Sequence, residues 1–221
     1  MLRHRLETLH RELNAQHFGG ALSDIPIRLS GRMRSRLGEL AVCLETGRPN
    51  EIAISRRHIA RHPWSEVEHT LLHEMVHQWY GDQVTPNDWR DVWMNEGMAL
   101  YLQGIWESER SGQPLDSLMD DWASYEPQMR DEAGPPGAFD PSTFGEGNIY
   151  YGPALMWHEL RRRIGDERFW SVVRAWPADR DNGNAGRRFF VDWLNRQTGQ
   201  DLTDFYDAWL LDPSQPPRLA G

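Results

Sequence analysis

The stretch Ser65-Glu-Val-Glu-His-Thr-Leu-Leu-His-Glu-Met-Val-His-Gln-Trp-Tyr80 is the segment that decides the fold. Its apolar residues follow a helical period, so it predicts one continuous helix. His73 and His77 stand four residues apart, which puts their imidazoles one above the other on a single helical face. Two imidazoles in that arrangement can bind one zinc ion, and the carboxylate of Glu74 can hold a metal-bound water. The alternative is an amphipathic helix that carries two histidines without a metal.

A third ligand for such a metal is expected on the next helix. Catalytic zinc sites use three protein ligands and leave a fourth position for water. Glu96 is separated from His77 by 18 residues and lies in Trp93-Met-Asn-Glu-Gly-Met-Ala99, inside a predicted helix. Imidazoles that bind zinc also need hydrogen-bond acceptors that fix their tautomers, and Asp91 is a candidate for that role.

Composition and charge limit the class of protein. With 221 residues, 39% of them apolar, the chain can bury a sizeable core. A net charge of -9 disfavours nucleic-acid binding. The sequence contains no run of about 18 apolar residues that would span a membrane, and its start lacks the apolar core of a signal peptide. The single cysteine, Cys43, cannot form an internal disulfide, so we expect a cytoplasmic location.

The rest of the pattern predicts a small sheet before the motif helix and several helices after it. Ser65 and Glu68 form a capping box for the motif helix, and Gly81 ends it. The predicted elements are a helix at 2–17, strands at 25–30, 37–45 and 50–55 with a turn at 46–50, and helices at 56–61, 89–108, 115–130, 150–164, 166–176, 185–198 and 202–211. We expect one domain over residues 1–221, α+β but mostly α, with a sheet and zinc-helix lobe to about residue 110 and a helical lobe from about residue 111.

The spacing of the motif residues resembles a known family of metallopeptidases. His-Glu-x-x-His, an interval of 18 residues and a glutamate within Trp-x-Asn-Glu-Gly are similar to the gluzincins, specifically the aminopeptidase N and leukotriene hydrolase family. The likeness includes His77-Gln-Trp-Tyr-Gly81 and Asp204-Phe-Tyr-Asp-Ala-Trp-Leu210, and it covers about residues 65–217. It implies a thermolysin-like zincin fold, peptide or protein substrates, and one zinc ion per chain bound by the two histidines and the glutamate.

A further segment resembles the family's Tyr-x-Lys-Gly segment, whose tyrosine stabilises the oxyanion. This segment is Ile149-Tyr-Tyr-Gly-Pro-Ala-Leu-Met-Trp-His-Glu-Leu160. In register, Tyr150 takes the place of that tyrosine, and Tyr151 is the alternative. Gly152 and Pro153 stand where lysine and glycine are usual. The competing interpretation is an aromatic pair that packs in the core.

The chain departs from the family pattern before the motif helix. The sequence contains no Gly-x-Met-Glu-Asn segment, whose glutamate holds the substrate's α-amine in the family. Glu39, in Leu37-Gly-Glu-Leu-Ala41, is the candidate replacement, and the alternative is an exposed strand carboxylate. The first 80 residues are instead somewhat similar to SprT-type zinc proteases, in which a helix and a small sheet precede the motif helix.

Together these features predict a zinc metallopeptidase. Glu74 would take a proton from the attacking water and pass it to the leaving nitrogen, and Tyr150 would support the oxyanion. The resemblance favours an aminopeptidase, whereas the missing amine-binding segment favours a compact endopeptidase. A non-peptide hydrolase on the same zinc site and a zinc-stabilised binding protein without turnover are the other hypotheses. We expect neither a nucleic-acid nor a membrane partner.

Overall fold

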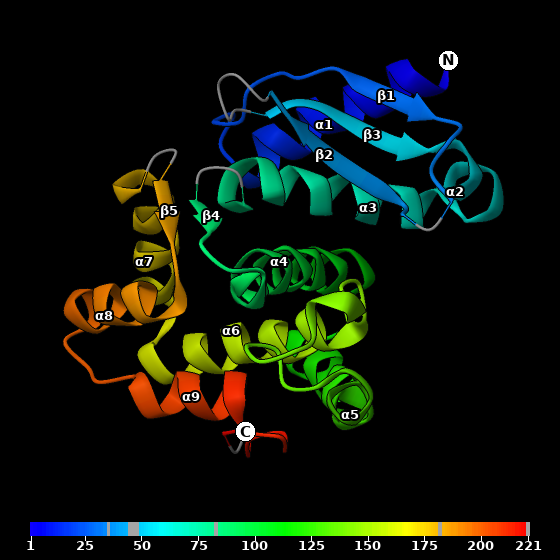
Figure 1. Ribbon diagram of the computed structural model, residues 1–221. Helices are drawn as coiled ribbons and strands as arrows, with labels where there is room; N and C mark the ends of the chain where they lie inside the picture. Colours follow the sequence, from blue (N-terminus) through cyan, green and yellow to red (C-terminus); the bar gives the residue numbers. More distant parts are fainter. Residues whose placement is uncertain (35, 44–48, 82–83, 181–182, 220–221) are drawn as a thin grey trace. The chain divides into compact units, whose positions relative to one another are not determined.

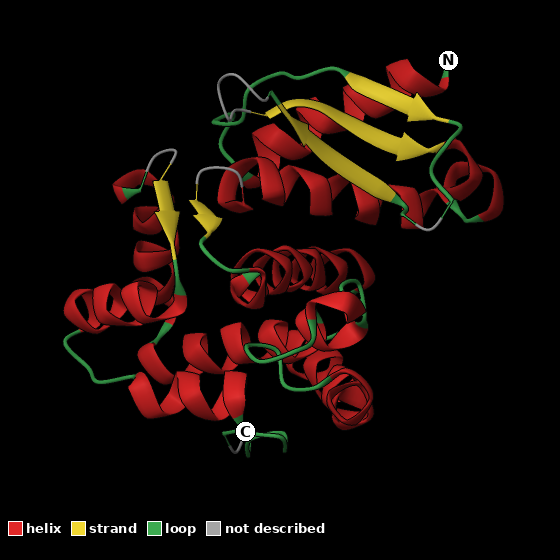
Figure 2. Ribbon diagram, viewed as in Figure 1, coloured by secondary structure: helices red, strands yellow, loops and turns green. Residues whose placement is uncertain are grey.

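A computed structural model describes residues 1–34, 36–43, 49–81, 84–180 and 183–219 (Figure 1). The chain divides into two compact units, Met1–Gln83 and Val84–Gly221. The first unit carries the sheet and the motif helix, and the second is mostly helical (Figure 2). None of the helices in the described part of the chain has the length and apolar character that a membrane span needs.

The first unit is a three-stranded sheet with helices packed on it (Figure 1). Its strands have the spatial order β1-β3-β2, with β1 parallel and β2 antiparallel to β3, so β2 lies at an edge. Helices α1 and α3 pack against each other and against the sheet, and α2 follows β3 directly. The elements are α1 (Leu2–His17), β1 (Ile27–Ser30), β2 (Gly38–Val42), β3 (Pro49–Ser55), α2 (Arg56–Arg61), α3 (Trp64–Val76) and the π-helical turn η1 (His77–Gly81).

Strand alternation separates the two faces of this sheet. Ile27 of β1 pairs with Ile52 of β3, and both side chains are fully buried on the face that the helices cover. The neighbouring residues point to the opposite face, where Arg28 and Glu51 form an ion pair at 2.8 Å. The predicted strands are therefore confirmed, with shorter bounds for the first two. Most of the predicted turn at 46–50 lies outside the described residues.

The predicted start of the motif helix is wrong by two residues. Helix α3 begins at Trp64 with Pro63 as its N-cap, and no side chain caps it. Pro63 has φ -61° and ψ 157°, an extended conformation, so the chain enters the helix directly after the proline. Ser65 thus lies inside the first turn and does not act as the cap. At the other end, the α-helix stops at Val76 and continues as η1 to Gly81, the predicted end.

The second unit is a set of packed helices with one short pair of parallel strands, β4 and β5. The sequence does not predict these strands, because each has only three residues. The predicted helices are confirmed with small changes in their bounds. The elements are β4 (Val84–Pro86), η2 (Trp89–Asp91), α4 (Trp93–Ser111), α5 (Leu115–Ala133), η3 (Pro141–Thr143), η4 (Gly147–Ile149), α6 (Tyr151–Ile164), α7 (Asp166–Asp179), β5 (Gly183–Ala185), α8 (Arg187–Thr198) and α9 (Thr203–Leu211).

Two glycines allow α4 to pack closely against its neighbours. A β-carbon on Gly97 would collide with Pro153 of α6. A β-carbon on Gly104 would lie 2.6 Å from Cη2 of Trp122 on α5. The close approach at Gly97 is therefore that of a neighbouring helix. This packing also explains why the second unit begins at Val84 and not near residue 111, since α4 belongs with α5 and α6.

A buried ion pair joins α5 to the end of α9. Arg130 and Glu126 are 2% and 0% exposed, and Arg130 donates from Nε to Glu126 Oε1 at 2.8 Å. The guanidinium also donates to the carbonyls of Asp212 at 2.7 Å and Trp209 at 3.1 Å. Carbonyl groups at a helix C-terminus lack intrahelical partners, so Arg130 satisfies two of them while it neutralises Glu126.

Candidate active site

His73 and His77 lie at the junction between α3 and η1. Their ring centroids are 4.7 Å apart, with the ring planes at 78°. Both side chains are half-buried. The spacing of four residues therefore brings the two imidazoles together on one side of the first unit, as the sequence predicts.

The side chain of Gln78 anchors the π-helical turn that carries His77. The Gln78 side chain is buried, and its amide nitrogen donates to the carbonyl of Ser23 at 2.7 Å. Its Oε1 therefore accepts from Nε2 of buried His10 on α1, at 3.3 Å. Burial lowers the pKa of His10. Single-turn π-helices are frequent at functional sites, and here the turn fixes the backbone of His77 to α1.

Neither the π-turn nor its anchor follows from sequence reasoning. The π-helical turn η1 continues the apolar pattern of α3. The sequence therefore does not distinguish this wider turn from ordinary α-helix. The available hint is His10 itself, which is buried on α1 together with Leu6 and Leu13. A histidine on the apolar face of a helix needs a polar partner, and that partner is found at Gln78.

Glu74 is buried on α3 and lies against the edge strand β2. Its carboxylate approaches the α-carbon of Gly38, where a side chain would collide with it. One turn earlier, Thr70 donates from Oγ1 to the carbonyl of Glu66 at 3.0 Å and lies 2.9 Å from Nε2 of His58. Glu74 is thus enclosed by β2 on one side and by a hydrogen-bonded turn of its own helix. An isolated glycine inside a strand signals such a close approach, so Gly38 could be found from the sequence.

Glu39 points away from Glu74. Because successive strand residues face opposite sides of a sheet, the direction of Gly38 toward α3 puts Glu39 on the other face. The Glu39 side chain is 45% exposed, and Oε1 lies 3.4 Å from Nη1 of Arg36. The structure of the first unit therefore does not bring Glu39 together with Glu74.

In the second unit, Tyr150 packs near the start of the helix that carries Glu96. Glu96 lies in the first turn of α4, where its N–H donates to the carbonyl of Val92 at 3.0 Å. Val92 packs with Phe139 and Ile149 in a buried cluster, and Tyr150 packs against that cluster. One apolar cluster thus holds both the first turn of α4 and the tyrosine before α6.

Tyr151 has a different environment. Its ring lies edge-on to Trp122 and Tyr125 of α5, with centroid distances of 5.4 Å in both contacts. Burial raises the pKa of the Tyr151 hydroxyl. Tyr151 is half-buried and packs beside aromatic residues of α5, whereas Tyr150 packs beside the Val92 cluster. The choice of Tyr150 over Tyr151 as the oxyanion donor stays a prediction.

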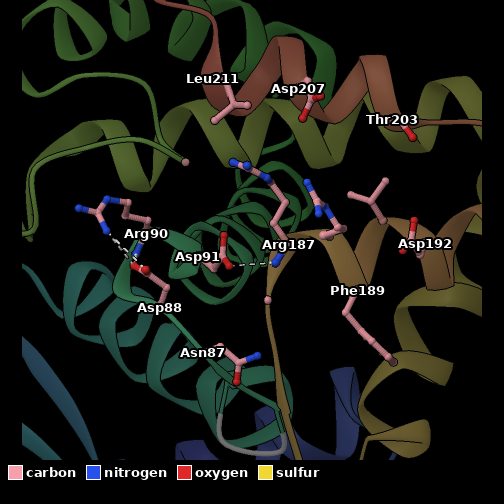
Figure 3. Close-up of a pocket in the computed structure, with 14 residues that line it drawn as sticks. Asn87, Asp88, Arg90, Asp91, Arg187, Phe189, Asp192, Thr203, Asp207 and Leu211 are labelled. Carbon is pink, nitrogen blue, oxygen red and sulfur yellow. Dashed lines mark hydrogen bonds and ion pairs between the residues drawn. The ribbon is translucent and has the colours of Figure 1, made fainter.

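Asp91 lines a groove of about 890 Å³ in the second unit, between η2, α8 and α9 (Figure 3). Its Oδ2 accepts from the backbone N–H of Arg187 at 2.9 Å (Figure 3), and its Oδ1 accepts from Nε1 of Trp93 at 3.2 Å. Asp91 thereby caps the first turn of α8 and links it to the start of α4. Its role toward a zinc-bound imidazole stays a prediction.

The region that is similar to known proteins includes the motif helix and most of the second unit. The sequence matches the Peptidase family M1 domain over residues 41–209. It is 27% identical over 180 residues to Aminopeptidase N of Lactococcus lactis subsp. lactis, covering 76% of this chain and 20% of the relative. It is 28% identical over 158 residues to Aminopeptidase N of Streptomyces lividans, covering 64% and 18%. The chain thus spans about a fifth of the length of these curated relatives.

Solved structures share the fold of the chain. An M1 zinc metallopeptidase from Deinococcus radiodurans has a TM-score of 0.71 at 22% identity, covering 97% of this chain and 44% of that one. Leukotriene A4 hydrolase from Saccharomyces cerevisiae has a TM-score of 0.70 at 17% identity, covering 98% and 35%. The predicted fold class, mostly helical with a small sheet, is confirmed. The match over 169 of 221 residues (209 − 41 + 1) confirms the resemblance found in the motifs, and the chain belongs to the peptidase M1 family.

Proposed function

We propose that the protein is a zinc-dependent peptidase of the aminopeptidase type, with His73, His77 and Glu96 as metal ligands. The family match carries this proposal, because residues 41–209 include the motif helix, the glutamate of α4 and Tyr150. The curated relatives are named Aminopeptidase N, which supports hydrolysis at the amino end of peptides over cleavage within them.

The donor atoms fit a zinc ion. Two adjacent imidazoles and one carboxylate make up a ligand set that zinc takes in catalytic sites. We propose that His73, His77 and Glu96 supply these donors, and each of the three residues is half-buried. Partial burial suits a catalytic site, because the substrate must reach the metal. Zinc bound there would lower the pKa of a water ligand to about 7 and polarise the substrate carbonyl.

Glu74 is the proposed general base. It stands beside His73 on α3, and its carboxylate is buried against β2. In the proposed reaction Glu74 takes a proton from the attacking water. It then gives that proton to the leaving nitrogen as the peptide bond breaks.

Tyr150 would donate a hydrogen bond to the substrate's carbonyl oxygen as negative charge develops on it. The ring packs against the cluster of Val92, Phe139 and Ile149, and we expect this packing to orient the hydroxyl before substrate binds. Preorganisation of this kind is what makes oxyanion donors effective. The alignment of the segment with the family's Tyr-x-Lys-Gly segment supports this choice.

The position of Glu39 in the first unit does not support a role in binding the substrate's amine. Its carboxylate faces away from Glu74 and lies beside Arg36. We therefore expect Glu39→Gln to leave kcat/KM for an unblocked peptide substrate unchanged. A loss of tenfold or more in that variant would restore Glu39 as the amine-binding residue.

The test combines metal content with two substrates. The zinc-loaded protein should contain one zinc ion per chain and hydrolyse leucine p-nitroanilide, while the N-acetylated substrate should be cleaved far more slowly. Glu74→Gln should keep the zinc and lose nearly all hydrolysis. Glu12→Gln, an exposed glutamate on α1, is the matched control and should keep full activity. Equal cleavage of both substrates would contradict the aminopeptidase assignment, and zinc binding without any hydrolysis would contradict the enzyme assignment.

A further inference from the structure

The space beside Glu74 exists because residue 38 has no side chain. A β-carbon built on Gly38 would lie 2.5 Å from Oε1 and 2.9 Å from Cγ of Glu74, and 2.8 Å from Cγ2 of Thr70. Side chains essentially never approach β-carbons within 3.0 Å. Gly38 is also absent from the glycines with positive φ, so its backbone conformation is open to other residues. The requirement for glycine at this position is therefore one of space.

The surroundings of Gly38 cannot move away easily. In the sheet, Gly38 pairs with fully buried Ile54, and the next residue, Ser55, donates from its N–H to the carbonyl of Leu37 at 2.9 Å. On the helix, Thr70 is held by its hydrogen bond to Glu66. Between these two elements, the atom closest to the added methyl group would be Oε1 of Glu74, at the end of a longer side chain. A methyl group at residue 38 would therefore displace the Glu74 carboxylate.

We propose that Gly38 is a positioning residue for Glu74. The bare α-carbon of the edge strand forms the wall against which the Glu74 carboxylate lies, and it fixes the direction from which that carboxylate meets the attacking water. This inference rests on the proposed function for the role of Glu74 as the base, but the contact itself does not depend on activity. Misplacement of a reacting group by about 1 Å can cost about 10²-fold in rate, so a small side chain suffices to disturb the reaction.

The first measurement compares two glycine-to-alanine variants in the zinc-loaded protein. Gly38→Ala should lower kcat by roughly 10- to 100-fold, with KM and the zinc content unchanged, because the histidine ligands are not touched. Gly31→Ala is the matched control in the same unit, since a β-carbon there meets no atom within 4 Å. Equal kcat values in the two variants would overturn the proposal.

The second measurement is independent of activity. Gly38→Ala should lower the midpoint of thermal unfolding by several degrees in the wild type. It should lower it equally in a Glu74→Gln background, which keeps the shape of the side chain. In a Glu74→Ala background the loss should be clearly smaller, because Oε1 and Cγ are gone and the contact with Thr70 alone remains. An equal loss in all three backgrounds would refute the contact. An inactive wild type with the predicted coupling would refute the proposed function and leave the packing of Gly38 on Glu74 intact.

Discussion

Removal of the Arg130 side chain should destabilise the second unit more than any change on its surface. Arg130→Met leaves Glu126, which is 0% exposed, without its cation, and it leaves the carbonyls of Trp209 and Asp212 without their donor. Breaking one side of a buried ion pair costs about 3–5 kcal/mol in the free energy of unfolding. For a chain of this size, each kcal/mol lowers the melting temperature by about 2–4 °C. We therefore expect Arg130→Met to melt about 6–20 °C below the wild type.

Thermal and urea unfolding followed by circular dichroism measure this difference. The matched control is Arg3→Met in the ion pair Arg3–Glu7 of α1, which has the same spacing but is 62% and 28% exposed. Exposed pairs contribute about 0–1 kcal/mol, so this variant should melt close to the wild type. The double variant Glu126→Leu/Arg130→Met should recover much of the stability, because it buries no unpaired charge. A cost below about 1 kcal/mol for Arg130→Met would refute the reasoning, since a pair truly excluded from water cannot lose one partner so cheaply.

Three further predictions concern the site and its support. Tyr150→Phe should lower kcat by roughly 10²–10³-fold with little change in stability, whereas Tyr151→Phe should leave kcat nearly unchanged; the reverse result would exchange their roles. Gln78→Leu should weaken zinc binding by roughly tenfold or more in a chelator competition, because it frees the turn that carries the second histidine; wild-type affinity would show that the anchor is dispensable. Burial lowers the pKa of His58 and of His158 from 6.5, so the unfolded chain takes up more protons below that pH and the free energy of unfolding should fall between pH 7 and pH 5. An unchanged stability over this range would contradict it.

The predictable part of the site is the part encoded by local spacing. The interval between His73 and His77 fixes a shared helical face without any knowledge of the fold, and the structure keeps their rings 4.7 Å apart. The choice between Tyr150 and Tyr151 is different, because adjacent residues have the same local pattern. Their packing partners differ, because Tyr150 packs against the Val92 cluster and Tyr151 against aromatic residues of α5, and no local pattern predicts that difference.

The parts that sequence reasoning misses depend on contacts between distant segments. Asp91 is predicted from the sequence to be a candidate acceptor for a zinc-bound imidazole. Its carboxylate accepts from the N–H of Arg187, which is 96 residues away, and no local pattern predicts that contact. The boundary between the two units has the same origin. Helix α4 follows the motif helix closely in sequence, but its two glycines allow close packing against α5 and α6. The local sequence does not show which neighbouring helix a glycine will contact.

The face of β2 shows why one residue of register decides the candidate site. Leu37 and Leu40 are both apolar and stand three apart, so their side chains must point to opposite faces of the sheet. The sequence alone does not show which of the two faces the helices. The structure pairs Leu40 with buried Ile52 and leaves Leu37 48% exposed, which turns Gly38 toward Glu74 and Glu39 away from it. A slip of one residue would exchange the two faces. It would place a second carboxylate against Glu74 and remove the space that the Glu74 carboxylate occupies. The register that pairs Leu40 with Ile52 therefore also keeps the proposed base in position.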